Sequence, residues 1–429
     1  MTNRRSLASL IRILGPGFVS GAADNDPAGI ATYTQAGAQF GYGQLWTALF
    51  ALPLLIAVQE ACARIGAVTG KGLAALIKEN YSARVLYGAV AIILVANIVN
   101  IGADIGAMAE AIRLIVPIPF IILVLATALF TLALEIFSSY RIYSRYLKAL
   151  SAIALVYLLT ALFVEEPWLK ILKATFVPHI ELSFGFLFIM LGNIGTTIAP
   201  YLFFWQTSQE VEEDKAAGRI GPRGTVSISS HVIRNIRIDN AVGMFASQLI
   251  TWSIIVVSAT VLNQNGVTNL KTAADAARAL EPLVNSFPYA GFLAKLLFAI
   301  GIVSAGLLVV PVLAGSAAYA LSETLSWKEG LNLKLKSAHG FYGVITASTL
   351  IGVVIDFLGF DPIRLLVYTS VLNGVVAVPL ILLIILISRN RLVMGVHVSG
   401  RMSAAVTWLA FGTMTGAALA ALLTFWQGK

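Results

Sequence analysis

Long runs of apolar residues, separated by short polar segments, make up most of this sequence. Eleven runs can be distinguished, and most are close to the ~20 residues that an α-helix needs to cross ~30 Å of hydrocarbon. They lie near residues 10–36, 45–65, 86–114, 118–137, 147–164, 184–206, 241–262, 288–321, 342–357, 365–387 and 404–425. The pattern predicts an all-α membrane protein with eleven transmembrane helices.

Composition and charge support this class and indicate an orientation. Hydrophobic residues make up 58% of the chain and charged residues 12%, against about 25% charged in soluble domains. Alternate connecting segments hold 21 of the 29 Lys and Arg residues. This asymmetry is the positive-inside pattern, so the net charge of +8 does not indicate nucleic-acid binding. We expect a multi-pass protein of the cell membrane, with a cytoplasmic N-terminus and the C-terminus outside. The single cysteine, Cys62, excludes an intramolecular disulfide framework.

The first apolar run is interrupted by two acids, Asp24 and Asp26, followed by Pro27 and Gly29. Proline and glycine disfavour a continuous helix here. In a bilayer such a break is tolerated only inside protein or beside a polar cavity. A break that carries an acid in mid-membrane is how broken-helix transporters hold cations. The alternative is a loop at the membrane surface with both carboxylates solvated.

The sixth run contains a second interruption, in which Gly192, Gly195, Thr196 and Thr197 precede Pro200. The two breaks are five spans apart, so their helices run in opposite directions. An inverted repeat of five helices requires this arrangement and places its site between the breaks. We therefore expect one transmembrane domain over residues 1–429, with repeats at about 10–166 and 184–388 and an extra helix at about 403–425. The alternative is a simple proline kink.

Other polar residues fall within the apolar runs. Asn97, Asn100 and Asp104 share one face of the third helix, and Asn373 lies in the tenth. They either complete the site or form hydrogen bonds between packed helices, although a buried lone carboxylate such as Asp104 needs a partner or a proton. Four acidic residues also follow the sixth run: Glu210, Glu212, Glu213 and Asp214. We expect them to form a solvated helix end rather than a metal site.

The chemistry available at the two breaks favours hard cations. Neither break contains an imidazole or a thiol, so the donors are carboxylate, amide, hydroxyl and freed backbone carbonyl oxygens. Such oxygens suit Mg²⁺, Ca²⁺ or Mn²⁺ better than softer metals. Magnesium sheds its water reluctantly, and small residues leave room for a hydrated ion at Ala28, Gly29 and Ala199. No cofactor is expected apart from the transported ion.

Several motifs, in the right order, resemble the NRAMP divalent-metal transporters. The run Asp26-Pro-Ala-Gly-Ile-Ala-Thr32 resembles that family's first-helix Asp-Pro-Gly-Asn motif, and residues 195–201 resemble its sixth-helix Met-Pro-His region. Residues 64–72 and 102–104 are also similar to family segments. The resemblance implies a LeuT-like fold, in which a 5+5 inverted repeat with helices 1 and 6 broken at the midplane is followed by an eleventh helix.

The departures from the family pattern indicate a subgroup. Gly29 replaces the motif asparagine, Ala199 the methionine, and Tyr201 the histidine. Ala107 stands where the family often has a second acid in helix three. The lost ligands are those that suit manganese or iron, and the lost histidine and acid are those associated with proton coupling. The pattern is similar to the NRAMP-related magnesium transporters, whose site accepts a largely hydrated ion.

Together these considerations predict an alternating-access importer of divalent cations. We expect Mg²⁺, and also Mn²⁺, as substrate, transport without proton coupling, and a monomer in the lipid bilayer. The expected metal site comprises the carboxylate of Asp26, carbonyls near Ala23, Thr196 and Ala199, the small Gly29, and Asp24 and Asn373 acting on the water shell. Asp104, Tyr201 and Asn100 would line the pathway.

Three alternatives remain open from the sequence. One is a proton-coupled Mn²⁺ or Fe²⁺ importer of the main NRAMP type. A second keeps the fold but carries an organic solute, whose carboxyl group would sit poorly beside Asp24 and Asp26. The third is an intramembrane aspartyl protease or receptor, which would use Asp26 with Asp104 on a neighbouring helix.

Overall fold

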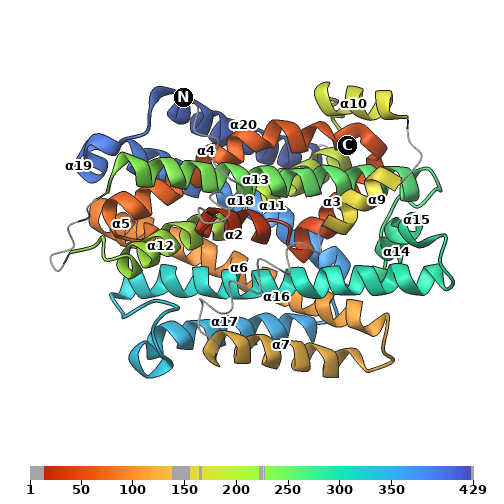
Figure 1. Ribbon diagram of the computed structural model, residues 1–429, viewed down its shortest axis with the longest axis horizontal. Helices are drawn as coiled ribbons and strands as arrows, with labels where there is room; N and C mark the ends of the chain where they lie inside the picture. Colours follow the sequence, from red (N-terminus) through yellow and green to blue (C-terminus); the bar gives the residue numbers. More distant parts are fainter. Residues whose placement is uncertain (1–13, 138–154, 164–166, 222–225, 227, 427–429) are drawn as a thin grey trace, which may run out of the picture.

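Helices form almost all of the regular structure in the computed structural model, which describes residues 14–137, 155–163, 167–221, 226 and 228–426 (Figure 1). The long helices are α4 (Trp46–Thr69), α6 (Ala83–Arg113), α7 (Phe120–Phe137), α13 (Ser230–Ser258), α16 (Ala290–Leu325), α17 (His339–Asp356), α18 (Pro362–Arg389) and α20 (Arg401–Trp426). Two further pairs are half-helices: α2 (Pro16–Ala23) with α3 (Pro27–Phe40), and α11 (Phe184–Thr197) with α12 (Pro200–Ala216). Shorter elements connect them: η1 (Gly41–Gln44), α5 (Leu73–Asn80), α9 (Leu155–Phe163), α10 (Trp168–Phe176), η3 (Ala259–Asn263), α14 (Ala273–Ala277), α15 (Glu281–Val284) and α19 (Arg391–Met394).

The helices follow the predicted apolar runs. Within the described part of the chain, nine helices or joined half-helices are long and apolar enough to cross a membrane. They match all the runs except the first, which forms α2 and α3, and the fifth, of which only α9 is described. The all-α, broken-helix prediction is therefore confirmed. Eight of the basic residues used to orient the chain fall outside the described residues: Arg4, Arg5, Arg12, Arg141, Arg145, Lys148, Arg223 and Lys429.

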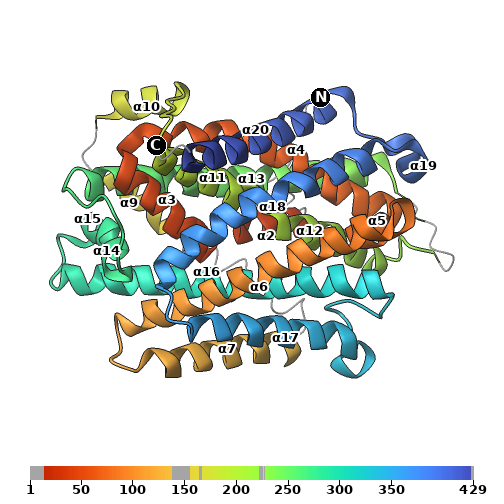
Figure 2. The same ribbon diagram turned by 180° about the vertical axis from the view of Figure 1, so that it is seen from behind.

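The bundle has two sides with the broken helices between them. On one side α6 packs along α16 and α17, and α7 lies against α6 and α17 (Figures 1 and 2). On the other side α13 packs against α2, α3 and α4. Helix α18 joins the two sides, because it contacts α6, α11 and α20. The ends of the half-helices are thus enclosed by long helices.

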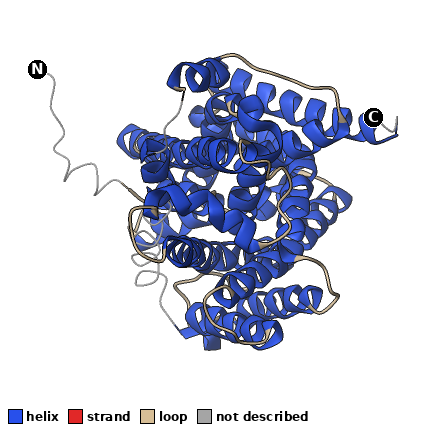
Figure 3. Ribbon diagram, turned by 90° about the vertical axis from the view of Figure 1, so that its right-hand side faces the viewer, coloured by secondary structure: helices blue, strands red, loops and turns tan. Residues whose placement is uncertain are grey.

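The two ends of the bundle differ in charge. Helices α5 and α19 and the last turn of α12 lie at one end, on the left of Figure 1, whereas α9, α10, α14 and α15 lie at the other. Figure 3 looks along the bundle from this second end. The segments around α5, α19 and the C-terminus of α12 belong to the Lys- and Arg-rich set of the sequence. We call this the basic end, and the other the opposite end.

Both broken helices break in the same way, at one extended residue before a proline. A residue that precedes proline is disfavoured in the α conformation. Asp26 accordingly has ψ 170° before Pro27, and Ala199 has ψ 130° before Pro200. In both cases the proline is then the first residue of the following half-helix, a position where its missing N–H costs nothing. The side chain of Asp26 caps α3, whereas Ala199 has no side chain that can cap α12.

Glycines allow the half-helices to pack closely on their neighbours. A Cβ on Gly21 of α2 would lie 2.3 Å from the carbonyl of Gly243 on α13, and one on Gly195 of α11 would lie 2.5 Å from the backbone of Gly374 on α18. Small residues of this kind bring backbones together in membrane helix pairs. They fix both broken helices against long, continuous ones.

Apolar side chains cover much of the outward surface of the long helices. On α7 the exposed residues include Ile121, Leu129 and Phe130, and on α20 they include Leu409 and Leu423. A soluble protein rarely exposes such continuous apolar faces. Polar residues of the broken helices are instead buried in the centre, as expected where lipid surrounds the bundle.

Candidate functional site

The centre of the candidate site is the carboxylate of Asp26, which is fully buried. One oxygen, Oδ1, accepts a hydrogen bond from the amide of Gly29 at 2.5 Å and from the hydroxyl of Thr196 at 3.3 Å. The other, Oδ2, accepts from the phenol of Tyr201 at 3.3 Å. The first break therefore meets the second at this carboxylate. The alternative of a solvated surface loop is wrong, because Asp24 and Asp26 are both 0% exposed.

Backbone carbonyls of the half-helices surround this acid. The last carbonyls of a helix have no partner within it, and they give its C-terminus a partial negative charge. Helix α2 ends at Ala23, whose carbonyl accepts a hydrogen bond from the Tyr201 hydroxyl at 3.0 Å, and α11 ends at Thr197. Two helix C-termini and one carboxylate thus provide negative potential at one place, as a cation site requires.

Asp24 is oriented away from this centre. Its Oδ2 accepts a hydrogen bond from the hydroxyl of Ser247 on α13, and its Oδ1 has no hydrogen-bond partner. The same serine receives a bond from the amide of Asn25 at 3.2 Å. Asp24 is therefore positioned by α13, and it influences Asp26 through its charge rather than by a shared hydrogen bond.

A chain of amides links the third and tenth helices beside the site. Asn373 on α18 donates to Asn100 on α6 at 3.3 Å, and Asn100 donates to Asp104 Oδ2 at 2.9 Å. The Oδ1 atoms of Asn373 and Asp104 are buried without a hydrogen-bond partner. Asn97, on the same face of α6, donates instead to the carbonyl of Leu313, which is a packing bond. The Oδ1 atoms of Asn373 and Asp104 are thus available as acceptors for a ligand or its water.

The donor set around the breaks consists of oxygen atoms. Among the described residues, no group of three or more His, Cys, Asp or Glu side chains is arranged to hold a metal. Any cation at Asp26 would therefore depend on backbone and hydroxyl oxygens as well as on one carboxylate. The carbonyl of Ala199 accepts a bond from the amide of Leu202 at 3.2 Å, and a Cβ on Gly29 would lie 3.1 Å from Asp26 Oδ1. Gly29 therefore keeps space beside the carboxylate.

Polar contacts enclose the site towards the opposite end. The hydroxyl of Tyr33 is 3.0 Å from that of Thr197, and the hydroxyl of Thr32 donates to Ser370 at 2.8 Å. Beyond them lies a cavity of about 300 Å³ at the end of α3, α11 and α18. Gln35 forms part of its wall and accepts a hydrogen bond from the amide of Leu270 at 2.9 Å. This cavity lies on the opposite-end side of these contacts.

A single carboxylate holds the start of α2 at the basic end. Asp239 on α13 accepts hydrogen bonds from three amides, those of Gly15, Gly17 and Phe18, at 2.9, 2.8 and 3.0 Å. Ser20 of α2 is also hydrogen-bonded to Gln206 of α12. Together with the contact between Gly21 and Gly243, these bonds hold α2 against α12 and α13 between the site and the basic end.

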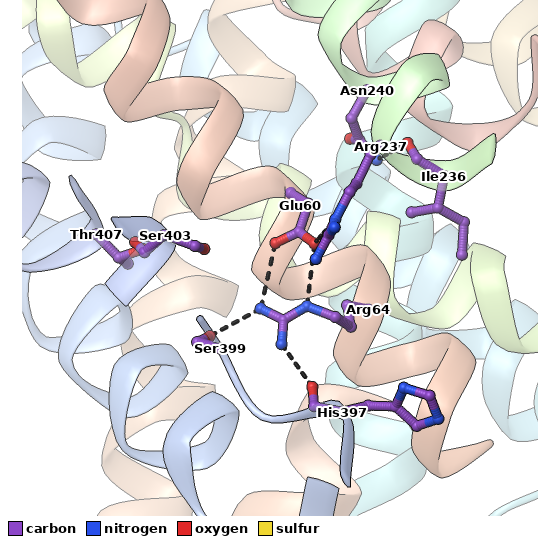
Figure 4. Close-up of polar contacts among 9 residues, drawn as sticks. All are labelled: Glu60, Arg64, Ile236, Arg237, Asn240, His397, Ser399, Ser403 and Thr407. Carbon is purple, nitrogen blue, oxygen red and sulfur yellow. Dashed lines mark hydrogen bonds and ion pairs between the residues drawn. The ribbon is translucent and has the colours of Figure 1, made fainter. Parts of the chain in front are cut away.

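A second polar network at the basic end joins two helices to the segment before α20 (Figure 4). The guanidinium of Arg64 on α4 forms two bonds to the carboxylate of Glu60, at 3.0 and 3.2 Å. It also donates to the carbonyl of His397 and the hydroxyl of Ser399, both at 2.7 Å, in the segment before α20. Arg237 of α13 donates to the same glutamate at 3.1 Å. The network fixes the segment before α20 to α4 and α13.

The prediction of a solvated acidic helix end after the sixth apolar run is wrong for three of its four residues. Glu210, Glu212 and Asp214 are buried, and only Glu213 is exposed. The reason is that α12 continues to Ala216 and the segment after α16 folds over it. Glu212 accepts bonds from the Tyr319 hydroxyl at 2.7 Å and the Asn332 amide at 2.6 Å. Glu212 therefore joins α12 to α16 and the segment after it, whereas Glu210 accepts a bond from Gln206 of the same helix and Asp214 pairs with Arg219.

Sequence reasoning missed several residues that position the site. Ser247 and Thr251 lie four apart on α13 beside Asp24 and Asn25, and their spacing within an apolar run was the available signal. Asp239 precedes the seventh run by two residues and holds α2 from there. Its partners are more than 220 residues away along the chain, so no local pattern identifies them.

Comparison with known proteins agrees with this geometry. Residues 17–424 match the Nramp family, described as natural resistance-associated macrophage protein-like. A relative from Ralstonia nicotianae named divalent metal cation transporter MntH is 26% identical over 97% of this chain and 91% of its own length. The crystal structure of an Eremococcus coleocola manganese transporter superposes with a TM-score of 0.75 at 18% identity, covering 99% of this chain and 88% of its own. MhsT in complex with L-phenylalanine gives 0.58 at 12% identity, covering 95% and 97%.

The fold is that of the LeuT-type membrane transporters, with two broken helices whose ends meet at a buried acid. Because the family match covers nearly the whole sequence, the chain belongs to the Nramp family.

Proposed function

We propose that this protein imports divalent metal cations, with Mg²⁺ as the main substrate and Mn²⁺ as a second. The observation that carries the proposal is the buried Asp26 carboxylate between the ends of two broken helices, with only oxygen donors around it. Oxygen donors suit hard divalent ions. The names of the Ralstonia and Eremococcus relatives, a divalent metal cation transporter and a manganese transporter, support the same class of substrate.

In this proposal Asp26 provides the charge, and the carbonyls near Ala23, Thr196 and Ala199 provide neutral oxygens. Tyr201 occupies the side of the site where the related family motif has histidine. Its hydroxyl rotates freely about the C–O bond, so it either donates to Asp26, as here, or turns an acceptor towards a bound ion or its water. Asp24, Asn100, Asp104 and Asn373 act on the water shell or line the route of the ion.

Transport then alternates between the cavity at the opposite end and the basic end. We place the basic end in the cytoplasm of a cell-membrane protein, following the positive-inside rule. An inward-moving divalent ion gains about 4.6 kcal/mol per 100 mV, twice the value for a single charge. This energy sustains roughly three powers of ten in concentration, so coupling to protons is not required.

The test is uptake of Mg²⁺ into proteoliposomes by an Asp26→Asn variant. The amide retains the capping oxygen for Gly29 but removes the charge. We expect roughly 100-fold lower uptake, the equivalent of about 3 kcal/mol for losing one partner of a buried charge pair. Asp361→Asn is the matched control, because Asp361 also precedes a proline and caps a helix, accepting from the Arg364 amide at 3.0 Å. Equal uptake by both variants would remove Asp26 from the site.

The identity of the ion is tested separately. Competition among Mg²⁺, Mn²⁺, Ca²⁺ and Zn²⁺ for uptake by the unmodified protein ranks the substrates. An Ala199→Met variant introduces a soft sulfur ligand beside the second break, and we expect it to shift preference towards Mn²⁺ or Cd²⁺. No shift would contradict the placement of Ala199 at the ion. Acidification of the liposome lumen with metal uptake, read by a pH-sensitive dye, would favour a proton-coupled mechanism instead.

A further inference from the structure

The short helix α10 lies on the outside of the bundle near the opposite end, beside α4 (Figure 1). Its sequence gives it three distinct edges at helical spacing. Ile171 and Thr175 are buried against the protein. Leu169, Leu172 and Phe176 are exposed, at 83%, 49% and 62%, and form an apolar edge. The third edge carries two lysines, Lys170 and Lys173, both exposed.

The lysine edge forms one wall of a cavity of about 560 Å³. The other walls come from the end of α3 and η1, around Phe40 and Tyr42, and from the end of η3, with Asn263 and Gln264. Lys170 lies over the ring of Tyr42, with Nζ 5.4 Å from the ring centre. The cavity thus touches the outer ends of the first and seventh helices as well as α10.

Among the residues that the structure describes, no acidic side chain lines this cavity. His179 lies at its margin, 3.0 Å from the carboxylate of Glu181, and Glu181 itself is outside the lining. Within the described part of the chain, the two lysines thus have no carboxylate beside them in the cavity lining. A cavity of this charge attracts an anionic group, and the amides of Asn263 and Gln264 add polar groups to the same wall.

We propose that this cavity binds the head group of an anionic phospholipid whose acyl chains lie along the apolar edge of α10. The placement of basic and apolar edges on one short helix is typical of helices at a membrane interface. Three apolar residues of the segment after α10 are exposed as well: Val177, Ile180 and Leu182. A free phosphate would use only the lysines, so the exposed apolar edge favours a lipid. Because the ends of α3 and η3 also line the cavity, a bound lipid would contact them as well as α10.

The experiment compares lipid retention by the purified full-length protein in nanodiscs of phosphatidylcholine with and without phosphatidylglycerol, followed by native mass spectrometry. The test variant is Lys170→Ala/Lys173→Ala. Each lysine near a membrane surface contributes roughly fivefold to anionic-lipid affinity, so we expect phosphatidylglycerol retention to fall roughly 30-fold. The charge-matched control is Lys271→Ala/Arg278→Ala, which removes two exposed basic residues of the same end outside this cavity. Its retention should match that of the unmodified protein.

A second variant separates lipid from free phosphate. Leu169→Ser/Leu172→Ser leaves both lysines but removes the apolar edge, and it should also lower phosphatidylglycerol retention. Inorganic phosphate, titrated against the detergent-solubilised protein, should cause no shift in melting temperature that depends on Lys170 and Lys173. A lysine-dependent shift with phosphate alone would overturn the lipid assignment. Equal retention by the lysine variant and its control would overturn the site itself.

Discussion

The hydrogen bonds from α2 to Asp239 lead to a prediction about how the basic end opens. Three amides of the first turn of α2 donate to one carboxylate of α13, at 2.8 to 3.0 Å. These amides have no partner within their own helix, and their positive end stabilises a negative charge. An Asp239→Asn substitution keeps the size of the side chain but removes the charge and one acceptor oxygen. It should therefore release the start of α2.

The expected change in free energy between the closed and open basic end follows from the hydrogen bonds that the substitution weakens. A hydrogen bond to a charged group contributes about 1.5–3 kcal/mol, and a neutral one about 1 kcal/mol. Replacing Asp239 by asparagine should therefore weaken the closed basic end by about 2 kcal/mol relative to an open state. This value corresponds to roughly a 30-fold increase in the open-to-closed ratio. The remaining contact between Gly21 and Gly243 opposes complete opening.

The rate of cysteine labelling measures the open-to-closed ratio of the basic end. The chain contains one cysteine, Cys62, which is buried and is replaced by serine to give a silent background. Ser20→Cys then places a thiol on α2, at a buried position between the site and the basic end. A membrane-impermeant thiol reagent supplied from the basic end should label this thiol roughly 30-fold faster when Asp239→Asn is present.

The control for this experiment is Asp275→Asn. Asp275 also accepts three hydrogen bonds, from the Lys271 and Thr272 amides and the Thr272 hydroxyl, but at the opposite end. Its loss should leave the labelling rate unchanged. If Asp239→Asn labels no faster than the control, Asp239 does not hold the basic end closed, and the reasoning fails.

Two further predictions concern the basic end. Arg64→Ala leaves the buried Glu60 with Arg237 as its one ionic partner among the described residues, so the protein should lose about 3 kcal/mol of stability in a denaturation experiment. Glu60→Gln/Arg64→Met should recover part of this loss, and an unchanged unfolding midpoint for Arg64→Ala would contradict the role of the network. Burial, together with repulsion from Glu323, raises the pKa of Glu329 in the segment after α16 from 4.5 to about 9. The folded protein therefore holds a proton there that the unfolded chain releases near pH 4.5, and stability should decline as the pH rises from about 5 to about 9. Glu329→Gln should flatten that part of the melting-temperature curve, and an identical slope in both proteins would refute the assignment.

The sequence was sufficient to predict the fold class and the two breaks. Pro27 and Pro200 each force an extended residue before them, and this local effect does not depend on the rest of the structure. The apolar runs were long enough to predict eleven spans, and nine of them match helices or joined half-helices of the described residues that are long and apolar enough to cross a membrane. These features are read directly from neighbouring residues, and for that reason the prediction agrees with the structure.

The orientation of individual side chains was not accessible in the same way. Asp24 turns towards Ser247 because of the way α13 packs against α2, and no sequence rule fixes the rotation of one helix against another. Glu212 is buried because the segment containing Asn332 folds over α12. Its acidic surroundings in the sequence indicated exposure, since charged residues are rarely buried without a partner. Tertiary contacts supplied that partner.

The position of the first break has a consequence for any bound cation. Asp26 belongs to α3 through its bond to the Gly29 amide, whereas the Ala23 carbonyl belongs to α2, and Tyr201 of α12 bonds to both. A rotation of α2 alone would move the Ala23 carbonyl away from a bound ion and leave the Asp26 carboxylate in place. In the proposed mechanism we therefore expect a stepwise departure towards the basic end, in which the neutral oxygen is lost before the attraction to the carboxylate is overcome.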